Sequence, residues 1–167
     1  MARLRRALAR RRSLADDSGA AIVEFIGLAL LLLIPLTYLI ITLGRVQAGA
    51  FAAESAARDA ARASVVTGVA ALEAGESPSR ATSLAFGRAL AVSSVVVEDF
   101  GFDPGADTTI ELACSSSPCF NQGSSVRADV QVHVSLPGIP GFVHAIAPLR
   151  VTVSASASSP VDGLAAP

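Results

Sequence analysis

The carboxylate of Glu24 is the one charged group in an otherwise apolar run, residues 20–44. An ionisable side chain at the centre of a membrane span costs about 2.5–3.5 kcal/mol and marks a functional position. Ala20 lies four residues earlier, on the same face of a helix. If the chain were cut between Gly19 and Ala20, the new amine, with a reference pKa of about 8, would be cationic at neutral pH. It could pair with Glu24 in the same chain or in a neighbour.

A simpler interpretation of Glu24 stays open. Near the cytoplasmic boundary of a span the cost of a charge shrinks. An acid in the first turns of a helix is also favoured by the helix dipole. Glu24 would then be tolerated without a partner.

The helix that would position Glu24 is long enough to cross a bilayer. Twenty-five residues rise about 37 Å, and the hydrocarbon core is about 30 Å thick. Residues 1–19 hold six Arg and two acids, whereas residues 45–167 hold seven Arg and eleven acids. Basic segments stay in the cytoplasm. The sequence therefore predicts a basic cytoplasmic leader at 1–19, a transmembrane helix at 20–44, an extracytoplasmic head at 45–157 and a flexible tail at 158–167.

A cleaved secretory signal is the competing interpretation of the N-terminal segment, with a cut near Ala48–Ala50. Such signals carry an apolar stretch of about 7–15 residues, and this one is longer. We therefore expect a retained, single-pass anchor in the cell membrane, with the N-terminus in the cytoplasm and the C-terminus outside it.

The motif around Gly19 resembles a known processing site. Residues 18–25 read SGAAIVEF ahead of the apolar helix, which is similar to the site at which type IV prepilins and pseudopilins are cut. Gly44-Arg45 and the Ala-rich residues 52–63 follow. Together they resemble, more specifically, the TadE-like pseudopilins or minor pilins of tight-adherence (Flp, type IV-like) pilus systems. The resemblance covers about residues 17–63.

The resemblance implies roles for four residues. In that family a membrane aspartic peptidase cuts after the glycine, and a glutamate at the fifth mature position guides assembly. Gly19 would then precede the cut, Ala20 would be the new N-terminus, and Glu24 and Phe25 would act in assembly. The implied partners are the membrane, a prepilin peptidase, other pilins or pseudopilins, and the inner-membrane platform proteins of the Tad apparatus. The implied location is the cell membrane or an extracellular pilus.

Beyond Arg45 the pattern predicts a membrane-anchored α+β protein. The anchor helix continues as an Ala-rich helix to about Leu72, and a break at residues 75–78 follows. Ser77 is placed to cap a second, short helix that runs to about Val92. The period of the apolar residues then changes to two, which predicts about four antiparallel strands, at residues 95–100, 108–114, 126–136 and 149–157. The apolar face of this sheet is expected to pack on the Ala-rich helix.

Two further features have open interpretations. A stripe of small residues, Gly49, Ala53, Ala57 and Ala61, could let helices of neighbouring subunits approach closely, or could reflect only an Ala-rich composition. Residues 137–148 form a loop whose apolar residues could cover a sheet edge or be a contact surface. They are Ile139, Phe142, Val143 and Ile146.

Little in the sequence is typical of catalysis. Cys114 and Cys119 are predicted to form a disulfide, because an exported domain meets oxidising conditions; free thiols are the alternative. A structural zinc site usually has four protein ligands, and the chain has two Cys and two His. His133 is expected on the solvent-exposed face of a strand and His144 in a loop. We expect no metal, no cofactor and no enzymatic activity, because neither a phosphate-binding glycine motif nor a nucleophile motif occurs. The basic bias is confined to the leader, so nucleic acid is not an expected partner.

Three functional classes remain. The first is a minor pilin or pseudopilin of a tight-adherence pilus, processed after Gly19 and assembled through its N-terminal helix. The alternative is an uncleaved, single-span module that binds an envelope or cell-wall ligand. The third is a secreted enzyme. The mature N-terminus distinguishes them, because they predict loss of residues 1–19, no loss, and loss of the whole apolar run.

Overall fold

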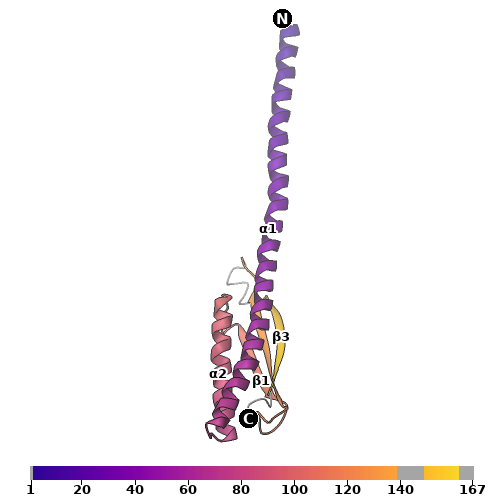
Figure 1. The fold of residues 1–167 in the computed structure, drawn as a ribbon. Coiled ribbons are helices and arrows are strands. Elements are labelled where there is room, and N and C mark those ends of the chain that lie inside the picture. Colours follow the sequence, from indigo (N-terminus) through magenta and orange to yellow (C-terminus); the bar gives the residue numbers. More distant parts are fainter. Residues whose placement is uncertain (1, 139–148, 162–167) are drawn as a thin grey trace. The chain divides into compact units, whose positions relative to one another are not determined.

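The computed structural model describes the backbone of residues 2–138 and 149–161, and within these the side chains from residue 19 onward. The chain divides into two compact units that meet between Thr42 and Leu43, and each is described by itself. The order of the elements is helix, helix and three strands (Figure 1).

The first unit contains the N-terminal part of α1 (Ala2–Glu73), which includes Pro35. Every side chain from residue 19 to residue 41 is exposed, and Leu31 reaches 76% exposure. The most apolar 18-residue window in Gly19–Glu73 has a mean hydropathy of 2.5 and no buried residue. A helix this apolar and uncovered is the expected form of a membrane anchor, because lipid rather than protein would cover it.

The second helix, α2 (Pro78–Asp99), begins as predicted. Ser77 is its N-cap, and the Ser77 hydroxyl oxygen accepts a hydrogen bond from the Arg80 amide at 3.4 Å. Pro78 occupies the first turn, where a missing amide proton costs nothing.

The end of α2 corrects the sequence prediction. The helix continues to Asp99, so the strand expected at residues 95–100 is wrong, and the described residues form three strands instead of four. The β-branched run Val95–Val97 favoured a strand in isolation. Tertiary packing overrides that preference, because every fourth residue from Ala81 to Val97 is buried and each such residue returns to the same helix face.

The sheet is antiparallel with the order β1-β2-β3. Its strands are β1 (Thr108–Cys114), β2 (Ser125–Ser135) and β3 (Arg150–Pro160). The alternation predicted for β2 is confirmed, since its apolar side chains from Val126 to Val134 are at most 1% exposed. β3 extends further than expected: Ser125 pairs with Pro160, and Val161 is 4% exposed. Residues 158–161, expected as the start of a frayed tail, are therefore part of the folded head.

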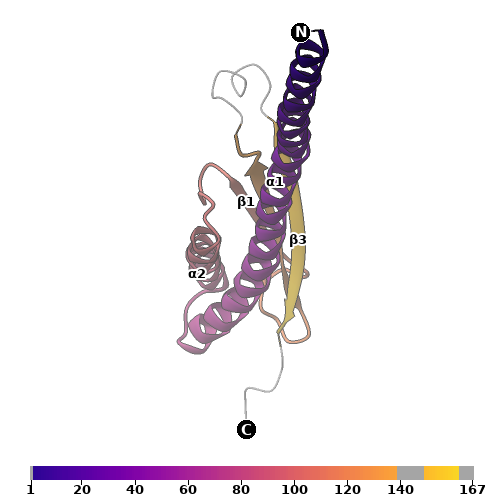
Figure 2. The ribbon, with the colours of Figure 1, turned by 90° about the horizontal axis from the view of Figure 1, so that it is seen from above.

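In the second unit α1 and α2 cover one face of the sheet, as both ribbon views show (Figures 1 and 2). Gly49 of α1 faces Val134 and Val153, and the Ser93 hydroxyl donates a hydrogen bond to the Ala56 carbonyl at 3.3 Å. The other members of the small-residue stripe, Ala53, Ala57 and Ala61, are at most 1% exposed, so the stripe is buried within the head. The stripe thus packs α1 against its own head, which is the close helix approach expected of small residues, made within one subunit.

α2 is also long and apolar enough to cross a membrane, with a mean hydropathy of 1.3 over its best window. Its buried face packs instead on α1 and the sheet, where Val97 joins Ala53 and Val130 in one core cluster. In this structure α2 is a core helix of the head. The apolar loop residues singled out in the sequence, with His144, and the C-terminal residues 162–167 lie outside the described part of the chain.

Candidate assembly site

The residues singled out around the predicted cut all lie on α1 and are exposed. Gly19, Ala20, Glu24 and Phe25 are helical, and Phe25 is 73% exposed. Ala20 and Glu24 are four residues apart, so the helix brings them to one face. The structure thus presents a carboxylate and the residue that would carry a new amine on the same side of an uncovered helix.

Glu24 has no partner within the described residues. The ion pairs there join Arg58 to Glu54, at 2.9 Å, and Arg127 to Asp129, at 2.9 Å. The side chains that flank Glu24, Val23 and Phe25, are 72% and 73% exposed. A carboxylate among apolar neighbours in a lipid environment is expensive unless it reaches water or a cation. The arrangement is therefore suited to pairing with a group supplied from outside this unit.

The two cysteines lie at the connection between β1 and β2. The structure joins Cys114 to Cys119, with their Cα atoms 5.6 Å apart. The same connection is held by Ser115, whose amide donates to the Ser125 carbonyl at 2.9 Å and whose hydroxyl accepts from the Ser125 amide at 2.8 Å. Both sulfur atoms pack against the cluster around Phe120. The disulfide and these hydrogen bonds therefore hold the connection between β1 and β2 against the core of the head.

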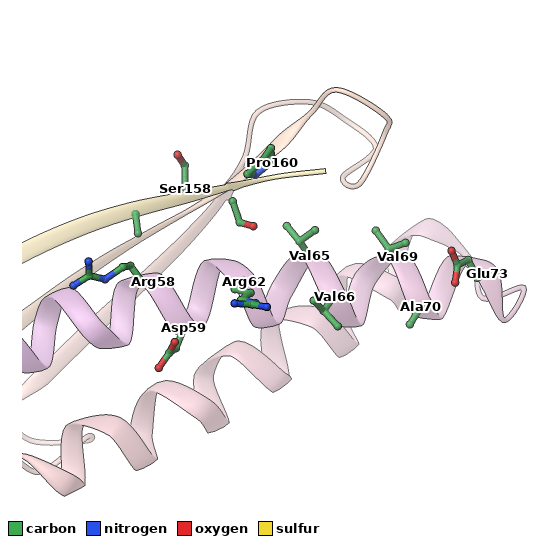
Figure 3. Close-up of a pocket in the computed structure, with 12 residues that line it drawn as sticks. Arg58, Asp59, Arg62, Val65, Val66, Val69, Ala70, Glu73, Ser158 and Pro160 are labelled. Carbon is green, nitrogen blue, oxygen red and sulfur yellow. The ribbon is translucent and has the colours of Figure 1, made fainter. Parts of the chain in front are cut away.

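An open groove of about 890 Å³ runs between the distal part of α1 and the end of β3 (Figure 3). In the close-up Val65 and Val69 point toward the strand, whereas Asp59 points away from it. Charged residues also line the groove, among them Arg58, Arg62 and Glu73. The sequence did not reveal this groove, because its walls are about a hundred residues apart in the chain and meet only through the packing of β3 beside α1.

The polar face of the sheet carries hydrogen-bonded pairs. Arg127 binds Asp129 through two guanidinium nitrogens at 2.9 Å, and this bond raises the pKa of Arg127. His133 Nδ1 lies 2.9 Å from Thr152 Oγ1, on the strand where the sequence placed it. Within the described residues no group of three or more His, Cys, Asp or Glu side chains is arranged to hold a metal ion.

A tight turn precedes β1. Asp103 Oδ1 accepts hydrogen bonds from the amides of Ala106 and Gly105, at 2.9 and 2.7 Å. Because both bonds favour the charged carboxylate, they lower the pKa of Asp103. The turn connects the end of α2 to β1.

The part of the chain that matches a known protein family lies in α1. Residues 19–62 match the family model of TadE-like proteins. This stretch is TadE-like. The resemblance seen in the sequence is confirmed for these residues, which begin at Gly19 and extend from the apolar helix into the part of α1 that packs in the head. α2, the sheet and the disulfide lie outside the TadE-like match. No curated protein and no solved structure matches the chain.

The TadE-like match suggests a protein associated with the Tad pilus, and hence with the membrane and with pilus components. TadE-like proteins are of a structural rather than an enzymatic kind. The long apolar helix at the start of the match is consistent with a membrane anchor.

Proposed function

We propose that this protein is a minor pilin or pseudopilin of a tight-adherence (Flp) pilus system, cut after Gly19 by a prepilin peptidase. The mature chain begins at Ala20, remains in the membrane through residues 20–44, and joins other pilins and the inner-membrane platform through this helix. Glu24 then receives a cationic amine, its own or that of a neighbouring subunit. The leader is cytoplasmic, the head is extracytoplasmic, and the chain crosses the membrane once.

The observation that carries this proposal is the position of Glu24. It is a charged residue on an exposed apolar helix, one turn after Ala20, and the TadE-like match begins at the preceding Gly19. A plain anchor has no need of a carboxylate within its apolar run. An assembling helix does, because a buried charge pair fixes the register of two apolar surfaces that would otherwise slide.

The head supports a structural role. Its side chains form a small-residue core between two helices and a sheet, and its cysteines are joined as expected outside the cytoplasm. On the described sheet Arg127 pairs with Asp129 and His133 with Thr152, and Asp103 holds the turn before β1. We propose that the protein acts by assembly, without a metal, a cofactor or a catalytic step.

The second candidate is an uncleaved anchor that presents a binding module. The open groove beside β3 favours it, because a sheet edge with an apolar floor can accept an extended ligand. In this alternative Gly19 remains joined to Ala20 in the mature protein, and the groove binds an envelope or cell-wall component.

Exchange of Glu24 tests the assembly role. We expect Glu24→Ala and Glu24→Gln to leave cleavage after Gly19 intact while reducing recovery of the protein with sheared pili or crosslinked to other pilins. The matched control is Glu76→Gln, which removes an exposed carboxylate from the turn between α1 and α2 and should assemble normally. Normal assembly of both Glu24 variants, in cells where the unaltered chain assembles, would refute the role given to Glu24.

A further inference from the structure

The end of the sheet where β2 finishes and β3 begins lies beside the first residues of the head. Ser135 and Arg150 form the last pair there, next to Val134 and Val151. Gly49 of α1 faces Val134, so this end of the hairpin is near the point at which the chain enters the head. We call Leu149, Arg150 and Val151 the sheet foot.

β3 and the head part of α1 run in the same direction. Val153 lies beside Gly49, and Pro160 shares the groove with Val65. Between these contacts α1 rises about 24 Å and β3 rises about 23 Å. The two elements are therefore close to parallel, as both ribbon views indicate (Figures 1 and 2).

This alignment fixes the level of the sheet foot. Arg150 precedes Val153 by about 10 Å along the strand, and Leu43 precedes Gly49 by about 9 Å along the helix. Arg150 is therefore level with Leu43, which is still inside the apolar run that ends at Gly44. The sheet therefore extends back to the level of the first residues of the second unit, Leu43 and Gly44, where the apolar run of the sequence ends.

The side chains of the sheet foot are suited to that boundary. Leu149 is 45% exposed and Val151 37%, and Arg150 is exposed between them. Apolar side chains next to an arginine are typical of membrane interfaces, where the guanidinium reaches lipid phosphate while the apolar groups leave water.

We propose that the sheet foot contacts the phospholipid surface of the bilayer crossed by residues 20–44, and so holds the head against the membrane before assembly. This inference rests on the membrane anchor of the proposed function. Arg45, at the same end of the head, is also exposed. The nearby acid Asp103 is engaged by the Gly105 and Ala106 amides, and Asp107 by the Asp103 amide at 3.3 Å. This end of the head therefore carries both positive and negative groups. We accordingly expect its contact with the bilayer to depend on burial of apolar side chains and on binding of arginine to lipid phosphate, more than on the net negative charge of anionic lipids.

Tryptophan fluorescence tests the contact, because the chain has no Trp of its own. The full-length protein is reconstituted into phosphatidylcholine vesicles whose acyl chains are brominated, close to the headgroup in one preparation and near the chain ends in another, so that both the interface and the bilayer centre are sampled. Leu149→Trp reports on the sheet foot, Ser158→Trp on the far end of the same strand, and Leu32→Trp on the anchor. We expect bromolipid to quench Leu149→Trp and Leu32→Trp by about twofold, as for aromatic side chains in the interface or the core, and to leave Ser158→Trp unchanged.

The anchor variant separates the failure of this inference from that of the proposed function. Quenching of Leu32→Trp without quenching of Leu149→Trp overturns the lipid contact and leaves the anchor standing. If neither is quenched, the contact and the anchor both fail. Equal quenching of Leu149→Trp and Ser158→Trp also overturns the contact as described, because the head would then lie along the membrane instead of standing on its foot.

Discussion

Gly49 of α1 lies directly against Val134 of β2. A Cβ atom added at Gly49 would come within 2.5 Å of Val134 Cγ2 and 3.2 Å of Val153 Cγ2, closer than carbon atoms normally pack. The helix and the sheet can approach this closely only because position 49 has no side chain. The contact joins the TadE-like helix to a sheet that lies outside the family match.

Gly49→Ala should therefore destabilise the head. We expect the free energy of unfolding to fall by about 1–3 kcal/mol through overpacking, even though Ala is the better helix former by about 1 kcal/mol. The measurement is urea denaturation of the full chain in detergent, followed by far-UV circular dichroism. The matched control is Gly87→Ala on α2, where an added Cβ meets nothing within 4 Å. That variant should be as stable as the unaltered chain or more so, and equal losses in both would contradict the close contact.

The disulfide should contribute measurably to stability despite its short loop. Closing residues 114–119 restricts the unfolded chain by about 2 kcal/mol on the loop-entropy estimate. Replacement of both cysteines by serine should lower the free energy of unfolding by that amount. A reducing agent should have the same effect on the unaltered chain and none on the double variant. If reduction leaves the unaltered chain as stable as before, the two cysteines do not cross-link the folded head.

The turn at Asp103 should give the head a pH dependence. Because the Ala106 and Gly105 amides lower the pKa of Asp103, the folded state favours the carboxylate. The stability that the Asp103 carboxylate supplies is fully present above its pKa in the unfolded chain, about 3.9 for an aspartate. This stability is lost as the pH falls through the lower pKa of Asp103 in the folded chain. Asp103→Asn should be less stable than the unaltered chain at neutral pH, and the difference should shrink below about pH 4. A difference that stays constant with pH would show that the charge of Asp103 has no part in the turn.

The sequence predicted those parts of the fold that rest on local pattern. The alternation of apolar and polar residues was enough to predict strand β2 and its buried face, because its inward side chains, such as Val130 and Val132, are fully buried. The start of α2 was predictable because Ser77 and Pro78 act on the backbone beside them. In both cases the signal and the structure it determines lie in the same few residues.

The errors arose where distant segments decide the outcome. Val95–Val97 read as a strand, but Val97 is buried against α1 and the sheet, and this packing keeps the helix going to Asp99. Ser158 and its neighbours read as a frayed tail, but pairing with β2 orders them. The groove beside β3 had no sequence signal, because it depends on how a helix and a strand far apart in the chain pack together.

The candidate assembly site could likewise be predicted only in part from the sequence. The types and spacing of Gly19, Ala20 and Glu24 are visible in the sequence, and the structure adds that the helix around them is uncovered. A partner for Glu24 could not be predicted from one chain, because no described residue of this chain supplies a cation to it. The pairing we propose is made by a processed terminus, and hence depends on a covalent change.

The mature N-terminus is the most direct test of this account. The membrane-extracted protein is analysed by intact mass and N-terminal sequencing, from cells with and without the prepilin peptidase. We predict a terminus at Ala20 that requires the peptidase and is lost in Gly19→Ala, a substitution the helix tolerates because nothing lies within 4 Å of the added Cβ. An intact Met1 or a terminus at Ala2 in cells with active peptidase would contradict processing and favour an uncleaved binding module. A terminus near Phe51 would instead make the protein a secreted domain.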